Sequence, residues 1–352
     1  MPLRLLLTGG GSGGPTAPLI ALTQYLRLTL PEPPEVLFLG SESGPERQMV
    51  EKAGIAFESI PSGKLRRYWS WENLRDPLRI LQGAGISALW LRRFRPEVIV
   101  SAGSFVSVPV AWVARPLGVP QVLLQMDVRP GLANRLMAPV ATALAHYPEP
   151  LKGFSRPALK KRVGPVIRPE ILSSNAEAGR SRFQLPDRPV LLITGGGQGA
   201  LGLSEAVRPW ISAWTQTHEV VHLTGAGKPP VSEASGYHAF EFVHEGMGDL
   251  LACADVVLTR AGMGMLGELA ALGKDAVLVP LPGSHQGDNA RWIAEKQAGV
   301  LLEQAELQAH GGPWWSSFCQ ERAPGQLGRR LMEVLPPGGA ESLAELVLEC
   351  AR

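Results

Sequence analysis

Two glycine-rich turns are the first candidates for ligand binding in this sequence. TGGGSGGPTAP at 8–18 and GGGQGA at 195–200 each follow a short apolar run and precede a helical pattern. A turn of this kind brings backbone N–H groups to a helix N-terminus, where an anion or a polar ligand can bind. Position 15 of the first turn is a proline, which has no titratable side chain.

The first turn also fits the dinucleotide pattern G-x-G-x-x-G through Gly9, Gly11 and Gly14. That use needs an acidic residue at the end of the second strand to hold a ribose. The expected strand EVLFLG at 35–40 ends on glycine, with Glu42 beyond it, and a second glycine turn is of little use to one dinucleotide. The pattern therefore favours another ligand, with glycines that serve only tight helix–strand packing as an alternative.

His285, Gln286 and Asn289 form a polar cluster after an apolar run and a Pro-Gly turn. Amide and imidazole groups both donate and accept hydrogen bonds, as the hydroxyls of a sugar require. The cluster also precedes the helical pattern DNARWIAEKQAG, so a helix cap is the alternative.

The segment 64–96 combines aromatic residues with arginines at roughly helical spacing. Its members are Arg66, Arg67, Arg75, Arg79, Arg92, Arg93 and Arg95 with Tyr68, Trp69, Trp71, Trp90 and Phe94. This mixture suits a helix at an anionic membrane surface, where each basic residue contributes about 1 kcal/mol. A helix with a core-facing apolar stripe and solvated arginines fits the composition nearly as well.

These candidates lie on a chain in which short apolar runs alternate with amphipathic ones. Strands are predicted at 3–9, 35–40, 97–103, 120–127 and 142–147, then at 189–194, 218–225, 237–243, 254–262 and 275–283. This order is typical of parallel sheets with crossover helices, whose ligands bind at the carboxyl ends of the strands. We predict an α/β protein of two doubly wound, Rossmann-like domains facing across a cleft, divided near the Pro-rich stretch 159–172.

Length and composition agree with that organisation. The 352 residues are 45% hydrophobic and 19% charged, with a net charge of +2, so no global field points to nucleic acid. The three cysteines, Cys253, Cys319 and Cys350, fit neither a disulfide framework nor a zinc site, which favours a reducing cytoplasm. Neither a signal peptide nor an apolar stretch of about 18 residues is expected.

Several motifs, in order along the chain, resemble the MurG family of bacterial UDP-N-acetylglucosamine transferases. They are the two glycine turns, SAGSFVSVP at 101–109, DVRPGLANRLMAP at 127–139, RAGMGMLGELAALGK at 260–274 and HQGDNA at 285–290. The resemblance implies a GT-B fold, with an acceptor and membrane-associating domain over 1–163 and a UDP-sugar domain over 164–352. The last helix can pack back on the first domain in such enzymes.

The activity that the resemblance implies is inverting transfer of GlcNAc from UDP-GlcNAc to undecaprenyl-diphospho-MurNAc-pentapeptide, lipid I, giving lipid II. No metal or other cofactor is expected, and the enzyme would work peripherally at the cytoplasmic face of the cell membrane. Transfer to a different lipid acceptor, and a non-catalytic UDP-sugar-binding homologue or scaffold, are the alternatives.

The resemblance also assigns residues to the two substrates. Glu268 matches the position that holds the donor ribose, with a solvated helix charge as the alternative, and the cluster at 285–289 matches the position that contacts GlcNAc. The other implied donor-site residues are Arg168, Gly197, Gln198, Gly199, Val243, His244, Met263 and Gly264. The implied acceptor-site residues are Ser12, Gly13, Gly14, Thr16, Ser104 and Asn134.

The acceptor side departs from the family at its catalytic positions. Pro15 stands where the family has a histidine commonly proposed to assist deprotonation of the acceptor, and Leu124–Asp127 replaces a His-Glu-Gln-Asn stretch. Asp127, at the end of an expected strand, is the new carboxylate there, and we predict that it is the general base. Ser12, Thr16 and the amides of 11–14 would then orient the acceptor diphosphate or hydroxyl.

The stretch 308–326 matches no family motif. Its pair Trp314–Trp315 fits the edge of the cleft or a core equally well.

Overall fold

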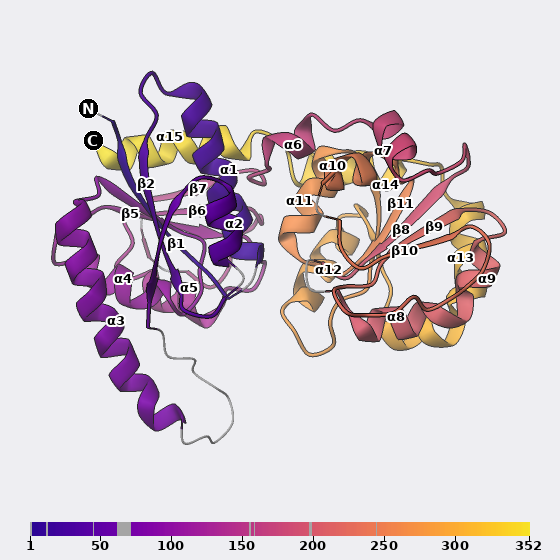
Figure 1. Ribbon diagram of the computed structural model, residues 1–352, viewed down its shortest axis with the longest axis horizontal. Coiled ribbons are helices and arrows are strands. Elements are labelled where there is room, and N and C mark those ends of the chain that lie inside the picture. Colours follow the sequence, from indigo (N-terminus) through magenta and orange to yellow (C-terminus); the bar gives the residue numbers. More distant parts are fainter. Residues whose placement is uncertain are drawn as a thin grey trace. The chain divides into compact units, whose positions relative to one another are not determined.

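The computed structural model describes residues 2–11, 13–44, 46–61, 72–154, 156–157, 159–196, 199–243 and 245–352, without the side chains of 72–78. The chain divides into two compact units, Met1–Arg168 together with Gly338–Arg352, and Pro169–Pro337 (Figure 1). The sequence places this boundary between residues 163 and 164, whereas the structure divides the chain after Arg168 and counts the C-terminal segment with the first unit.

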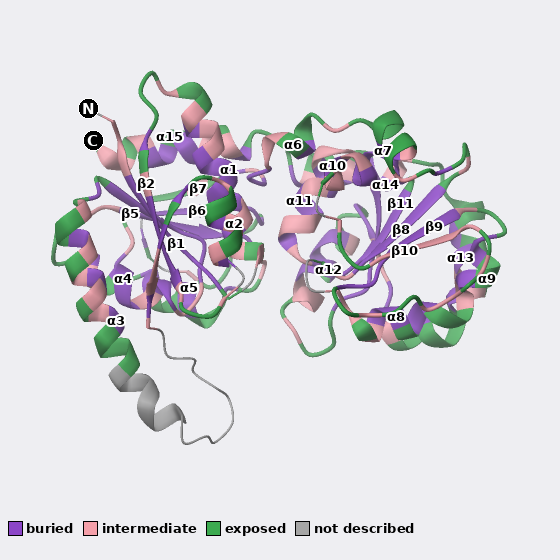
Figure 2. Ribbon diagram, in the orientation of Figure 1, coloured by how far each residue is buried: buried purple, intermediate pink, exposed green. Residues whose placement is uncertain are grey.

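The first unit is built on a seven-stranded parallel sheet in the order β3-β2-β1-β4-β5-β6-β7. The strands are β1 (Arg4–Thr8), β2 (Glu35–Ser41), β3 (Ala56–Ile60), β4 (Val98–Ser101), β5 (Gln121–Gln125), β6 (Ala143–His146) and β7 (Leu159–Arg162). Leu5–Leu7 of β1 have no exposed surface, because helices cover both faces of the central strands (Figure 2). The carboxyl ends of β1, β4 and β5 therefore carry their turns to one edge of the sheet.

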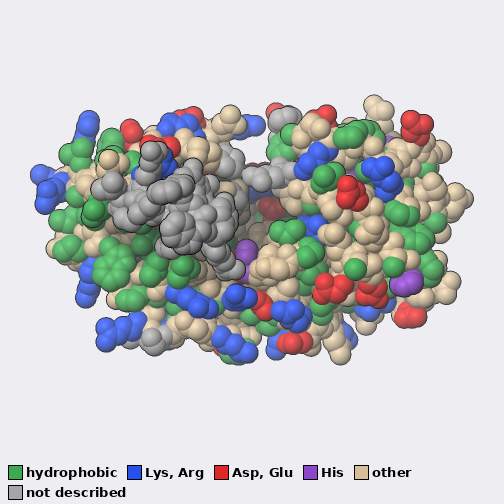
Figure 3. All heavy atoms as spheres, turned by 90° about the horizontal axis from the view of Figure 1, so that it is seen from below, with side chains coloured by type: hydrophobic (Ala, Val, Ile, Leu, Met, Phe, Trp, Pro, Cys, Tyr) green, Lys and Arg blue, Asp and Glu red, His purple; other side chains and the backbone are tan. Residues whose placement is uncertain are grey.

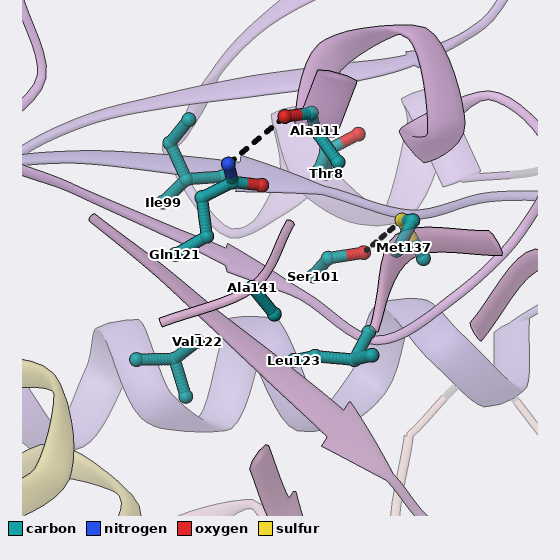
Figure 4. A pocket seen from close by; sticks show the side chains of 9 residues that line it. All are labelled: Thr8, Ile99, Ser101, Ala111, Gln121, Val122, Leu123, Met137 and Ala141. Atoms are coloured by element: carbon teal, nitrogen blue, oxygen red, sulfur yellow. Dashed lines mark hydrogen bonds between the residues drawn. The ribbon is translucent and has the colours of Figure 1, made fainter. Parts of the chain in front are cut away.

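Six helices lie in the described part of the first unit. They are α1 (Gly13–Thr29), α2 (Glu46–Lys52), α3 (Glu72–Phe94), α4 (Ser107–Ala114), α5 (Leu132–Met137) and α15 (Gly339–Ala351). The C-terminal helix α15 packs against α1, and α3 packs against α4. A cavity of about 10 Å³ lies between β4, β5 and the helices α4 and α5, lined among others by Ser101, Gln121 and Met137 (Figure 4). It is a packing void with room for one water molecule at most.

The second unit repeats the plan with six parallel strands in the order β10-β9-β8-β11-β12-β13. They are β8 (Val190–Thr194), β9 (Glu219–Leu223), β10 (Tyr237–Phe240), β11 (Val256–Thr259), β12 (Asp275–Leu278) and β13 (Val300–Leu301). The helices are α6 (Pro169–Leu172), α7 (Ala176–Arg182), α8 (Leu201–Val207), α9 (Ile211–Trp214), α10 (Met247–Cys253), α11 (Met263–Ala271), α12 (Gln286–Glu295), α13 (Gln304–Glu321) and α14 (Gln326–Val334), with a 3₁₀ turn at Arg208–Trp210. The α/β class and the two parallel sheets are as predicted.

The stretch 308–326 belongs mostly to α13, and its tryptophans pack in the core of the second unit. Trp315 is 3% exposed, and its ring lies 5.6 Å from Trp214 and 5.4 Å from Phe318. Trp314 packs against the same cluster. A role at the edge of a cleft is therefore not needed to explain this pair.

Candidate active site

The turn after β1 contains the predicted acceptor residues and leads directly into α1. Gly13 and Gly14 are the first two residues of that helix, and Pro15 is the third, where its missing N–H costs no helical hydrogen bond. Thr16 is fully buried. Ser12 lies outside the described residues. An added Cβ on Gly11 would lie 3.9 Å from Ser104 Oγ, so the turns after β1 and β4 are neighbours at the edge of the sheet.

Ser104 has a backbone φ of 88°, in the left-handed region that side chains other than glycine rarely adopt. Such a conformation costs about 1–3 kcal/mol and is concentrated at functional sites. The preceding Gly103 has φ 98°, and an added Cβ there would lie 2.8 Å from Asn134 Oδ1. The turn after β4 is thus fixed tightly against α5.

A buried amide pair supports the turn that carries Asp127. Asn134 Nδ2 donates to Gln125 Oε1 at 2.6 Å and to the Leu124 carbonyl at 3.3 Å, and Gln125 Nε2 donates to the Asp127 carbonyl at 2.6 Å. Gln125 and Asn134 are 1% and 7% exposed, whereas Asp127 is half-buried. The network fixes the backbone of Asp127 just after the end of β5.

Asn134 itself has an unusual environment. Its Oδ1 is buried and accepts no hydrogen bond from the residues that the structure describes. A buried unpaired acceptor costs about 1–3 kcal/mol, so this atom is a point where a donor from a ligand or water would be favourable.

The turn after β8 lines a pocket of about 290 Å³ in the second unit. The pocket is bounded by Gly195, Gly199, Ala200, Leu201, Gly202, Arg260, Leu281, Pro282, Gln286 and Gln304. Gly199 has φ 65°, and an added Cβ would lie 2.3 Å from the Thr224 carbonyl, so only glycine fits there. Gly197 and Gln198, predicted in the same turn, lie outside the described residues.

Arg260 is the charged group of this pocket, and the sequence analysis did not assign it a role. It follows β11 directly, is 6% exposed, and its guanidinium donates to the carbonyls of Val279 and Pro280 at 3.0 and 3.1 Å and to Gln304 Oε1 at 2.8 Å. Within the described ranges no carboxylate pairs with it, and its Nε has no partner. Burial lowers the pKa of Arg260, yet a guanidinium remains protonated at neutral pH. A buried cation without an anion makes the pocket a favourable place for an anionic ligand.

The polar cluster on α12 divides between two environments. Gln286 lines the pocket, and its Oε1 accepts from the Leu281 amide at 3.0 Å, while His285 is exposed at the start of the helix. Asn289 has no exposed surface and donates from Nδ2 to the Ala261 carbonyl at 3.0 Å, a contact that helps to hold the turn after β11.

Most of the other predicted donor residues belong to the second unit. Gly264 and Glu268 are half-buried on α11, and the side chain of Met263 is 3% exposed in the core, which leaves only its backbone to a ligand. Val243 is half-buried after β10, and His244 lies outside the described residues. Arg168 is half-buried and is the last residue of the first unit's N-terminal segment.

The aromatic and basic segment is partly described. Arg66, Arg67, Tyr68, Trp69 and Trp71 lie outside the described residues, as does the side chain of Arg75. On α3, Trp90 and Phe94 pack partly against the core, whereas Leu81 and Leu89 are 69% and 63% exposed. None of the helices among the residues described is long and apolar enough to cross a bilayer.

The whole chain is similar to known proteins along both units. Residues 5–146 match the glycosyltransferase family 28 N-terminal domain, and residues 190–311 match the glycosyltransferase family 28 C-terminal domain. Two curated relatives carry the name UDP-N-acetylglucosamine–N-acetylmuramyl-(pentapeptide) pyrophosphoryl-undecaprenol N-acetylglucosamine transferase. The one from Lachnospira eligens is 36% identical over 86% of this chain and 87% of its own length. The one from Lachnoclostridium phytofermentans is 39% identical over 79% of this chain and 78% of its own.

Solved structures share the fold. The crystal structure of Acinetobacter baumannii MurG superposes with a TM-score of 0.77 at 21% identity, covering 99% of this chain and all of the other. A Neisseria meningitidis UDP-GlcNAc 2-epimerase bound to UDP-GlcNAc has a TM-score of 0.69 at 12% identity, again covering 99% of this chain and all of the other.

Proposed function

We propose, from the premise that this chain belongs to glycosyltransferase family 28 and within it to the MurG enzymes, that it transfers GlcNAc from UDP-GlcNAc to undecaprenyl-diphospho-MurNAc-pentapeptide. The product, lipid II, is the lipid-linked disaccharide of peptidoglycan synthesis. The observation that carries the assignment to this chain's own residues is the pocket beside the second glycine turn, with buried Arg260 at its wall.

The donor diphosphate suits that pocket. A nucleotide diphosphate is an anion, and Arg260 is a buried guanidinium that no carboxylate neutralises within the described ranges. The following helix α8 has only seven residues, so the guanidinium is the stronger source of positive potential. Glu268 on α11 would accept from the ribose hydroxyls, and Gln286 and His285 would contact the sugar.

The acceptor suits the turns after β1, β4 and β5 in the first unit. The attacking hydroxyl has a pKa far above 7, so a general base accelerates its reaction about 10²–10⁴-fold. We assign that role to Asp127, whose turn is held by Gln125 and Asn134. The acceptor hydroxyl gives its proton to the Asp127 carboxylate while the hydroxyl oxygen bonds to the anomeric carbon of GlcNAc. The bond from that carbon to UDP breaks, UDP departs, and the configuration at the carbon is inverted.

The decisive experiment measures UDP released from UDP-GlcNAc with and without lipid I. A transferase releases UDP only when lipid I is present, whereas a UDP-sugar-binding scaffold releases none in either case. Other undecaprenyl-linked acceptors, offered in place of lipid I, test the alternative of a different acceptor.

Asp127→Asn is expected to lower kcat at least 100-fold while leaving UDP affinity unchanged, because the amide cannot take a proton and the donor site lies in the other unit. Glu149→Gln, an exposed carboxylate beyond β6, is the control. Turnover of the Asp127 variant within threefold of wild type would refute the assignment of the base.

A membrane-facing surface is the third part of the proposal. Exposed apolar side chains lie on α3 (Ile80, Leu81, Leu89), on α4 (Trp112) and on α5 (Leu132, Leu136). Arg92, Arg93, Arg115 and Arg135 are exposed on or beside the same helices. Figure 3 shows hydrophobic and basic side chains side by side on one face of the first unit. Apolar residues ringed by arginines suit a peripheral contact with anionic lipid, here at the cytoplasmic face where the acceptor lipid is made available.

Vesicle sedimentation tests this surface. Wild-type protein is expected to sediment with anionic phosphatidylglycerol vesicles and to be released by about 0.5 M salt, because exposed charges are screened within a few ångströms at that ionic strength. Leu81→Glu with Leu89→Glu should reduce recovery several-fold, and Leu28→Glu, at a position that is 78% exposed on α1, should not. If equal amounts of protein sediment with neutral and with anionic vesicles, the proposed membrane-facing surface is wrong.

A further inference from the structure

A buried carboxylate lies beneath the acceptor-side glycine turn. Glu46, the first residue of α2, has no exposed surface. Its Oε2 accepts from the Gly11 amide at 3.2 Å, and its Oε1 accepts from the Ser41 amide at 2.9 Å and from the Ser41 hydroxyl. No lysine or arginine pairs with it in the part of the chain that the structure describes. A buried anion without a cation is tolerated only when donors surround it, as they do here.

The backbone around this carboxylate is shaped to admit it. An added Cβ would lie 2.4 Å from Oε1 at Gly10 and 1.7 Å from Oε2 at Gly44, and at Gly40 it would lie 3.3 Å from Glu46 Cγ. Three glycines from three places in the sequence therefore leave the room that Glu46 fills. The carboxylate ties the turn after β1 to the end of β2, which pairs directly with β1.

We infer that Glu46 is a positioning residue that fixes the Gly10–Gly11 end of this turn and closes it to phosphate, so that the turn reads a neutral, hydroxyl-bearing part of the acceptor. The inference rests on the proposed function. In an ordinary phosphate-binding turn, the amide of Gly11 would point to the ligand's anion. Here that amide already donates to a carboxylate, and a phosphate at the same place would meet a buried negative charge.

This arrangement also explains why the turn can match the dinucleotide-binding pattern and yet not bind a dinucleotide. The position that a pyrophosphate would take at Gly10–Gly11 is occupied by Glu46. The acceptor's own diphosphate must then bind away from the Gly10–Gly11 end of the turn, which leaves that end to the sugar that carries the attacking hydroxyl.

Glu46→Gln separates the contacts of the two oxygens. The amide oxygen of the new side chain still accepts from Ser41, whereas its NH₂ group faces the Gly11 N–H, so two donors oppose each other. Loss of a hydrogen bond to a charged group corresponds to a factor of about ten or more, and we expect the KM for lipid I to rise by that factor. The KM for UDP-GlcNAc should stay within twofold. Glu42→Gln, an exposed carboxylate just beyond β2, is the matched control and should change neither constant.

Binding of two soluble acceptor analogues tests the exclusion of phosphate. One is short-chain lipid I, and the other carries the same sugar and peptide on a phosphate-free linker. Glu46→Gln should raise both dissociation constants by the same factor. A change confined to the diphosphate analogue, or no change in either, overturns the inference.

Hydrogen exchange provides a readout that does not depend on turnover. In Glu46→Gln, faster exchange is expected at residues 9–14 and not in β8–β12, and exchange unchanged at 9–14 overturns the inference. If wild-type protein releases no UDP in the presence of lipid I, the proposed function is wrong. That result leaves the inference about Glu46 open to test, because hydrogen exchange and analogue binding are measured without catalysis.

Discussion

Arg260 shows how one residue can define the chemistry of a pocket. Its guanidinium donates hydrogen bonds to two backbone carbonyls and to Gln304. These bonds fix its orientation in the pocket that Gly199 also lines. A lysine keeps the charge but not the planar fork that reaches three acceptors at once. The geometry, as well as the charge, is therefore part of the site.

Replacing Arg260 is expected to weaken UDP binding. Arg260→Lys should raise the dissociation constant of UDP about tenfold, and Arg260→Met should raise it further, because hydrogen bonds to charged groups contribute about 1.5–3 kcal/mol. Calorimetric titration with UDP measures both. Arg330→Met is the control, because it removes a guanidinium of α14 that donates to Gln297. If both Arg260 variants bind UDP within twofold of wild type, the diphosphate does not lie against this side chain.

At the scale of elements, a buried histidine joins α8, β9 and β10. His222 Nε2 lies 3.1 Å from Ser204 Oγ, and Nδ1 lies 2.8 Å from the Tyr237 hydroxyl. The side chain is 1% exposed, and burial lowers its pKa to about 4. Since the ordinary value is about 6.5, the unfolded chain binds the proton more readily than the folded one. This contribution to stability is therefore complete above about pH 6.5 and is lost as the pH falls toward 4.

Urea unfolding at pH 7.5 and pH 5.0 checks this dependence. The His222 contribution should fall by about 2 kcal/mol between the two conditions, from the integrated difference in proton binding. His222→Asn removes the titrating group, so the stability difference between wild type and variant should shrink by that amount at pH 5.0. His310→Asn, at an exposed position on α13, is the control, and its free energy of unfolding should change between the two pH values as that of wild type does. A constant difference between wild type and His222→Asn at the two pH values would contradict the argument.

The elements differ in how well the sequence predicts them. The central strands were predictable because both of their faces are buried, so runs such as Leu5–Leu7 are continuous apolar stretches. The edge strand β7, with the sequence LKKR, falls in the stretch where the sequence predicts the domain boundary. Its exposed side chains carry no apolar signal, and its pairing with β6 is a backbone property. Strands β3 and β13 were missed for related reasons, because one is half-buried and the other has two residues.

The site shows the same division. Glycine turns are local features, and both were found from their spacing. Glu46 and Arg260 were not, because an isolated charged residue in a sequence is ordinarily solvated, and only tertiary contacts decide that these two are buried. Arg260 had one local signal, its place directly after the apolar run VVLT of β11. Glu46 had none, since its partner Gly11 is 35 residues away.

At the scale of the whole molecule, the C-terminal helix belongs to the unit formed by the start of the chain. Leu343, Leu346 and Val347 of α15 have no exposed surface, and the helix contacts α1 and the strands β4, β5 and β6. At the start of the helix, an added Cβ on Gly339 would lie 2.0 Å from the Gly164 carbonyl. The first unit is thus completed by a segment that lies beyond the whole second unit in the sequence.

Cavity-forming substitutions in α15 and α14 should therefore act on different units. Leu346→Ala is expected to destabilise the first unit by about 2–5 kcal/mol and to raise hydrogen exchange in α1, β4 and β5. Leu331→Ala, at an equally buried position on α14, should act on β12 and α11 instead. UDP binding is expected to survive the first substitution, because the donor pocket has its own core. If either variant raises exchange equally in both sheets, the two units unfold as one cooperative body and cannot be perturbed separately.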